Sequence, residues 1–131
     1  MSTLTVHHIG YLVKKIEKAQ KAFLSMGYTL EQDTVYDDIR KVHICFLIKD
    51  GYRVELVAPA SDDSVVSGLM KRYKNSPYHI CYETTDFEKD YATLTENGFL
   101  AIDTLTPALA LQNREVVFLS NASMGMIELI R

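Results

Sequence analysis

The sequence of 131 residues contains few cysteines and no long apolar or basic run, and each of these absences argues against a class of protein. Its two cysteines, Cys45 and Cys81, lack a CxxC spacing, so we expect reduced, half-buried thiols rather than a disulfide. No apolar stretch approaches the roughly 18 residues of a membrane-spanning helix, and no basic segment followed by an apolar one opens the chain. We therefore expect a cytoplasmic protein without a membrane partner.

Clusters of positive charge are also missing. The chain has 14 Lys and Arg against 17 Asp and Glu, for a formal net charge of −3. Its densest basic run, residues 71–75, is more typical of a solvated helix end than of a binding patch. The charge pattern therefore argues against nucleic acid as a partner.

The sequence contains an internal repeat, which has to be recognised before a fold is assigned. Residues 8–28 align with 79–99 without a gap, and 43–57 parallel 115–130 with one inserted residue. The alignment pairs His8 with His79, Gly27 with Gly98, Phe46 with Phe118 and Glu55 with Glu128. Two related modules therefore make up most of the chain.

Each module has the pattern β-α-β-β-β. Alternating apolar residues predict a strand over 5–13, and apolar residues at helical spacing predict a helix over 15–26 that ends at Gly27. In the second module we expect Asp86 to cap the matching helix and Gly98 to end it. The later strands are predicted over about 28–36, 40–48, 52–58, 99–105, 113–120 and 125–131.

The predicted fold class is α+β, in a single domain of 131 residues. Module one covers residues 1–58, a connector covers 59–76, and module two covers 77–131. The connector is predicted to be structured, with a helix over about 63–73 whose N-cap is Ser61 or Asp62.

Strand alternation assigns side chains to two faces of each predicted strand. In 42–48, we expect Val42, Ile44, Phe46 and Ile48 to pack under the helix. His43, Cys45 and Leu47 would then lie on the open face, with Glu115 as the repeat mate of His43. Similar assignments put a second set on the open face: His8, Glu55, His79 and Glu128.

These four residues predict a metal site. Burying a carboxylate on an apolar strand is costly unless the carboxylate is paired or binds a cation. Two imidazoles and two carboxylates on one face suit a divalent transition metal with positions left for water or substrate. The donor set does not select among Zn, Co, Ni and Mn.

Several motifs resemble the vicinal oxygen chelate superfamily, which includes glyoxalase I, methylmalonyl-CoA epimerase and bleomycin resistance proteins. They are "HHIG" at 7–10, "VELVAP" at 54–59, "YHICYE" at 78–83 and "IEL" at 127–129. The resemblance implies paired βαβββ modules whose mixed sheet curls into a cup, with helices outside. It also implies that His8, Glu55, His79 and Glu128 are the metal ligands, the residues already selected by strand alternation.

The resemblance further implies an enzyme that moves a proton beside a thioester or hemithioacetal carbonyl. A metal ion stabilises the developing enolate as a Lewis acid, and a carboxylate transfers the proton. We assign the base to Glu128, because a family ligand of this kind can leave the metal, and Glu55 can return the proton from the opposite face. The resemblance also implies a homodimer.

The residues favour a methylmalonyl-CoA epimerase-like isomerase over a glyoxalase I-type lyase (lactoylglutathione lyase). The acidic-Ser turn and helix after residue 59 resemble the epimerases, but the region 106–119 lacks their glycines. A non-catalytic small-molecule-binding relative is the third alternative. His43 and Glu115 are additional candidates for the cup, while Arg53 and Arg114 are expected to be solvated surface residues.

Overall fold

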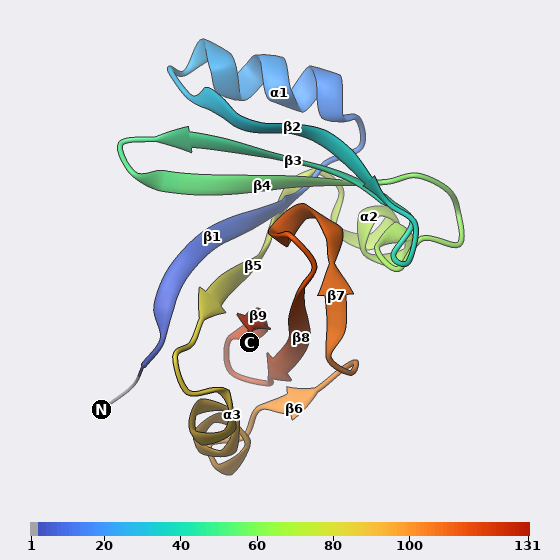
Figure 1. The fold of residues 1–131 in the computed structure, drawn as a ribbon. Helices are drawn as coiled ribbons and strands as arrows, with labels where there is room; N and C mark the ends of the chain where they lie inside the picture. The colour runs from blue at the N-terminus through green and yellow to red at the C-terminus, as the bar shows by residue number, and fades with distance from the viewer. Residues whose placement is uncertain (1–2) are drawn as a thin grey trace. The chain divides into compact units, whose positions relative to one another are not determined.

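The computed structural model describes residues 3–131, which form two compact units. The N-terminal unit comprises His8–Tyr78, and the C-terminal unit comprises His79–Arg131 together with the described residues up to His7. Figure 1 shows the elements of both units along the chain. The predicted α+β class is confirmed: each unit combines a mixed sheet with a helix packed on one of its faces.

The N-terminal unit contains a sheet with the strand order β2-β3-β4-β1. Strand β1 is parallel to β4, whereas β3 is antiparallel to both of its neighbours. Helix α1 contacts β2, β3 and β4, and Figure 1 shows it lying along this sheet. The bounds of these elements are β1 Thr5–Leu12, α1 Ile16–Ser25, β2 Thr29–Asp37, β3 Val42–Lys49 and β4 Tyr52–Pro59.

The core of this unit lies between α1 and the sheet. Ile16 and Phe23 are the buried residues of α1, at the spacing expected for one helix face. Gly27 follows the helix with φ +96°, a left-handed conformation that glycine adopts without strain from a Cβ. The cluster buried with Ile16 and Phe23 consists of Val13, Cys45, Leu47, Val54, Leu56 and Ala58.

The C-terminal unit repeats this arrangement with the strand order β5-β9-β8-β6, and β7 also pairs with β8. Strand β5 is parallel to β9, as β1 is to β4. The core of the unit forms between α3 and strands β8 and β9. The elements are β5 Ser76–Glu83, α3 Phe87–Glu96, β6 Leu100–Ala101, β7 Thr106–Ala108, the short 3₁₀ helix Leu109–Leu111, β8 Arg114–Asn121 and β9 Gly125–Ile130.

The predicted start of the connector helix is wrong. Helix α2 covers Ser67–Tyr73, and its N-cap position is Val66 rather than Ser61 or Asp62. The residues before it form turns that bond to the β2–β3 turn: the Val65 amide donates to the carbonyl of Arg40 at 3.2 Å. Since these bonds hold the chain in turns, the helix begins about one turn later than predicted.

The continuous strand predicted over 99–105 is also wrong. The segment forms only the two-residue β6, and pairing resumes at β7. Between them, Asp103 Oδ1 accepts a hydrogen bond from the Phe118 amide at 2.8 Å, so a side chain takes the place of a strand partner. Proline at position 107 also cannot donate a ladder hydrogen bond.

The face assignment for residues 42–48 is reversed. Cys45 and Leu47 pack in the cluster under α1, and Phe46 lies on the face of Glu55, its register partner. Both faces of β3 are apolar, so alternation separated the two sets correctly without determining which set the helix covers. His43 therefore shares the α1 side with Cys45, because alternate residues of a strand point the same way.

Candidate metal-binding residues

Two of the four predicted ligands meet in the N-terminal unit. His8 on β1 and Glu55 on the parallel strand β4 bring Nε2 and Oε1 to 3.3 Å. Both residues are buried, with only 1% and 5% of their surface exposed. Glu55 is the register partner of Gly10, two residues after His8, so both side chains lie on the same face.

The second pair lies in the C-terminal unit and has the same construction. His79 on β5 and Glu128 on the parallel strand β9 place Nε2 and Oε1 3.1 Å apart. Each residue is 4% exposed. Glu128 is the register partner of Cys81, again two residues after the histidine. Each unit therefore brings one predicted histidine against one predicted glutamate, a pairing that the repeat alignment did not specify.

A phenylalanine packs against each histidine. The rings of His8 and Phe46 have centroids 5.3 Å apart and an interplanar angle of 71°. For His79 and Phe118 the corresponding values are 5.2 Å and 86°. Both contacts are edge-to-face, an arrangement favoured by the charge distribution of aromatic rings. Strand β3 in the N-terminal unit and strand β8 in the C-terminal unit therefore supply the phenylalanine that fixes the imidazole orientation.

The spacing within each pair fits a bound divalent metal ion. Imidazole nitrogen and carboxylate oxygen bind zinc at about 2.0–2.2 Å, so two adjacent ligands on one ion lie about 2.9–3.4 Å apart. The observed separations of 3.3 Å and 3.1 Å fall in this range. The same separations fit a hydrogen bond between a protonated imidazole and a carboxylate. Metal binding to these residues would therefore displace protons.

Two further predicted candidates lie away from these pairs. The ring of His43 lies against Tyr36, with centroids 5.3 Å apart, on the α1 side of its sheet. Glu115 lies two residues from Val117, which packs with α3, and its carboxylate is 3.8 Å from Arg131. The expectation that both residues face the cup is therefore wrong, because strand alternation does not determine which face the helix covers.

The two arginines expected at the surface, Arg53 and Arg114, both form ion pairs. Arg53 bonds to Glu31 at 2.6 Å, and Arg114 bonds to Glu83 at 3.0 Å. All four residues are exposed or half-buried. The prediction of solvated surface positions is confirmed for both arginines.

The two cysteines differ in their surroundings, although both are buried and reduced. Cys45 lies in the core under α1, where burial raises the pKa of its thiol to about 11. Cys81 lies on the face of Glu128. The predicted location on the open face is therefore wrong for Cys45 and confirmed for Cys81.

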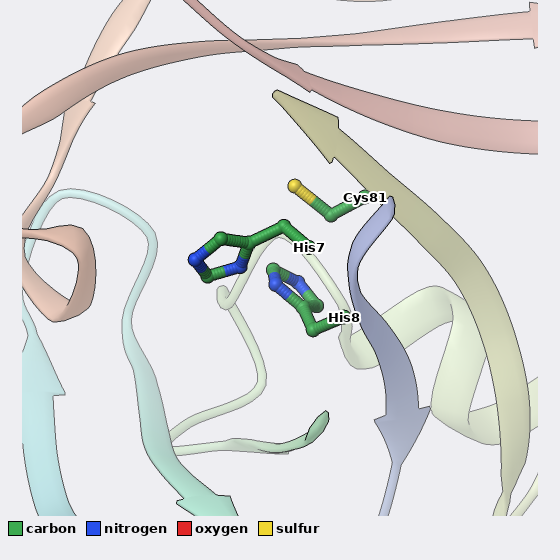
Figure 2. A group of neighbouring side chains, drawn as sticks. All are labelled: His7, His8 and Cys81. Carbon is green, nitrogen blue, oxygen red and sulfur yellow. The ribbon is translucent and has the colours of Figure 1, made fainter. Parts of the chain in front are cut away.

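Figure 2 shows a neighbour of the ligands that the sequence did not single out, His7, beside the thiol of Cys81. A ring nitrogen of His7 and the Cys81 sulfur, both in the C-terminal unit, lie within 4.8 Å of each other. Two donors are fewer than the three or four protein ligands of ordinary zinc sites. The contact became visible only with the structure, because His7 precedes His8 in the strand and alternation assigns it to the other face.

The chain belongs to the glyoxalase/bleomycin resistance protein/dioxygenase superfamily, whose family model matches residues 7–118. The matched segment contains three of the four predicted ligands and ends before Glu128. The predicted family resemblance is therefore confirmed.

Solved structures with the same fold include two named relatives and one without an assigned function. A hypothetical protein from Bacillus halodurans C-125 has a TM-score of 0.85 at 22% identity, with 98% of this chain and 94% of that chain covered. Methylmalonyl-CoA epimerase from Mycobacterium tuberculosis has a TM-score of 0.84 at 19% identity, over 99% and 89% of the two chains.

A methylmalonyl-CoA epimerase in complex with methylmalonyl-CoA and NH4+ has a TM-score of 0.83 at 20% identity, over 98% and 94%. At these identities the likeness establishes the fold. No curated protein sequence matches this chain significantly. Among residues 3–131, no helix has both the length and the hydropathy needed to cross a bilayer.

Proposed function

We propose that His8, Glu55, His79 and Glu128 together bind one divalent metal ion. The observation that carries the proposal is the repeated His–Glu pair, buried in both units with nearly equal separations of 3.3 Å and 3.1 Å. Two ligands seldom hold a metal firmly in a protein, whereas four form an ordinary site. Zn, Co, Ni and Mn all suit this donor set.

The reaction that we propose is proton transfer at the carbon beside a thioester carbonyl, as in methylmalonyl-CoA epimerase. Such a carbon is a weak acid, and the metal would supply Lewis-acid stabilisation of the negative charge that develops on the carbonyl oxygen. Glu128 would take the proton, and Glu55 would return a proton to the opposite face. Reversing the configuration requires this arrangement, because one base alone tends to return the proton to the face it left.

The burial of the two carboxylates supports this role. Glu55 and Glu128 are 5% and 4% exposed, so each acts in surroundings where few water molecules compete with a substrate. Phe46 and Phe118 hold the adjacent imidazoles edge-on, which keeps each His–Glu pair in one orientation. A site with fixed donors favours the transition state without reorganising during the reaction.

A glyoxalase I-type lyase is the second candidate, and one observation favours keeping it. The segment before β8 contains no glycine, and Gln112 and Asn113 occupy left-handed conformations there with φ 57° and 62°. Side chains at these positions occupy space that glycines would leave open for a bulky acyl carrier. A hemithioacetal substrate is smaller and needs less room.

Proton exchange in deuterated buffer tests the proposed reaction. The metal-loaded protein is incubated separately with methylmalonyl-CoA and with the glutathione–methylglyoxal hemithioacetal, and deuterium at the carbon beside the carbonyl is followed by NMR. Exchange with inversion of methylmalonyl-CoA is the expected result. Lactoylglutathione formation alone would assign the lyase instead. Binding of either compound without exchange would identify a non-catalytic binding protein.

We also propose that the protein is a cytoplasmic homodimer. The four proposed metal ligands could then come from one chain or from two. Mixing the variants His8→Ala and His79→Ala after unfolding and refolding separates the two arrangements. If each site uses one chain, every site in the mixture has lost a ligand and metal binding stays absent. If each site uses two chains, random pairing restores about a quarter of the sites.

A further inference from the structure

A groove in the N-terminal unit carries features that the proposed metal chemistry does not use. It has a volume of about 580 Å³, within the range typical of small-molecule sites. Its walls come from the end of β1, the first turns of α1 and the start of β5. The lining residue Tyr11 packs with α1, so the groove lies on the helix-covered face of the sheet, whereas His8 lies on the other face.

The floor of the groove is apolar and aromatic. Tyr11 and Phe23 meet edge-to-face, with ring centroids 5.2 Å apart, and Ala19 and Ala22 add small side chains on α1. Phe23 is largely covered, while Ala22 is exposed. The floor therefore offers an apolar surface of two aromatic rings and two small side chains, on which a hydrocarbon or a ring can lie.

The rim of the groove is basic. Lys14, Lys15 and Lys18 line it, and all three are exposed. Within residues 3–131, none of the three has a carboxylate within 4.0 Å. A chain with a net charge of −3 thus concentrates three uncompensated positive charges around one apolar groove. This arrangement is complementary to an anion.

The backbone adds to the positive potential at the same end of the groove. Helix α1 begins at Ile16 after Lys15, and no side chain caps its first turn. The helix dipole favours negative charge at this end, where the first turn carries one acidic residue, Glu17. Asn75, also in the lining, accepts a hydrogen bond from the Lys14 amide at 2.7 Å, which ties this rim to the segment before β5.

The second unit lacks this combination. The repeat mates of Lys14 and Lys15 are Thr85 and Asp86, and the Asp86 carboxylate caps α3 by accepting from the Lys89 amide at 3.3 Å. The first turn of α3 carries two acidic residues, Glu88 and Asp90, whereas that of α1 carries only Glu17. The equivalent helix end is therefore already satisfied, and it disfavours an anion.

We propose that the groove binds a phosphate monoester with an apolar body, and that it does so independently of the metal. The phosphate would lie among Lys14, Lys15 and Lys18, and the apolar body would lie over Tyr11, Phe23 and Ala22. Lysine suits phosphate because it presents a compact charge with three donors.

Titration with hexyl phosphate, followed by the amide resonances of Ala19 and Ala22 in the metal-free protein, tests the proposal. Hexyl phosphate should bind at least about tenfold more tightly than inorganic phosphate, because only the ester covers the apolar floor. The double variant Lys14→Ala/Lys18→Ala should weaken it by a further factor of about ten. The matched control Lys89→Ala, at the repeat mate of Lys18, should leave binding unchanged.

Three results would overturn the proposal: equal affinity for inorganic phosphate and hexyl phosphate, unchanged binding in the double lysine variant, or resonance changes confined to the C-terminal unit. Since all three lysines are exposed, their replacement is expected to preserve the fold, which the amide spectrum itself reports. The outcome is independent of metal loading and of proton exchange, so failure here would leave the proposed metal chemistry untouched.

Discussion

The two units are alike where the His–Glu pairs lie and differ where the helices begin. In both, a histidine on one strand meets a glutamate on the parallel neighbour, and a phenylalanine on the third strand holds the imidazole. The helix α1 starts at an uncapped lysine, whereas α3 starts at a capping aspartate. The strands that carry the His–Glu pairs match between the units at these positions, while the starts of the two helices differ.

A second difference concerns the buried polar groups behind the helices. In the C-terminal unit the buried Asp90 accepts hydrogen bonds from the hydroxyls of Thr84, at 2.6 Å, and Thr3. Its repeat mate in α1 is Ala19, which has no polar side chain. The C-terminal unit therefore secures the start of the chain with a polar network for which Ala19 provides no counterpart in α1.

Replacing Glu128 and Glu55 separately should give the largest effects, and the two variants should differ from each other. Glu128→Gln should reduce proton exchange by about 10²–10⁴-fold, because it removes the proposed base while an amide oxygen can still bind the metal. Glu55→Gln should allow exchange to continue but suppress inversion of configuration. Exchange and inversion are measured together by NMR and by chiral analysis of the product. Equal loss of both activities in the two variants would remove the distinction between their roles.

Replacing Phe46 or Phe118 by alanine tests how similarly the two units pack around their histidines. Phe46→Ala should lower the free energy of unfolding by about 3–5 kcal/mol, since Phe46 is nearly fully buried. Phe118→Ala should cost less, because Phe118 is only half-buried. Urea unfolding of both variants and the wild type measures the difference. A larger loss at Phe118 would contradict this account of their packing.

Asp90 provides a pH-dependent test of the polar network. Hydrogen bonds from Thr3 and Thr84 hold the pKa of its carboxyl below the ordinary value of 3.8. Its contribution is therefore fully present above that pH and is lost as the pH falls through the lowered pKa. Asp90→Asn should cost about 1–3 kcal/mol at pH 7 and much less in strong acid.

Urea unfolding at pH 7 and at about pH 2 measures this change, with the exposed Glu88→Gln as the matched control. The control should differ from the wild type by less than about 0.5 kcal/mol at pH 7. A cost for Asp90→Asn that does not depend on pH would show that packing, rather than the charge of the carboxylate, explains its effect.

The smallest effect comes from making α1 resemble α3. Lys15→Asp places the residue type of position 86 at the start of α1 and should stabilise the protein by about 0.5–1 kcal/mol through capping. The same change should weaken hexyl phosphate binding in the groove. Thermal unfolding measures the first effect and NMR titration the second. Destabilisation would mean that Lys15 contributes to packing as well as to charge.

The repeat made the four candidate residues and their strands predictable from the sequence. That His8 meets Glu55 and His79 meets Glu128 became visible only in the structure. Strand β1, helix α1 and the Asp86 cap also lie where local patterns indicated. The orientation of β3 was not predictable in the same way, because Phe46 and Leu47 are equally apolar and only the register with Glu55 separates them. Asp103, which interrupts the strand predicted over 99–105, acts through a contact with Phe118, fifteen residues away.

The groove beside α1 could not be predicted from the sequence either. Lys14, Lys15 and Lys18 look like ordinary solvated helix residues until Asn75 and the end of β1 are placed beside them. A groove of this kind depends on contacts between segments that are distant in the sequence. Such contacts can be predicted from one sequence only where an internal repeat or a family motif indicates them.

Metal stoichiometry tests the central claim most directly. The purified protein is stripped, reloaded with cobalt and measured by elemental analysis, beside His8→Ala from one pair and His79→Ala from the other. If both pairs form one site, the wild type holds about one ion per chain and both variants lose it. Two ions per chain, an ion retained in either variant, or no ion in the wild type would contradict the joint site.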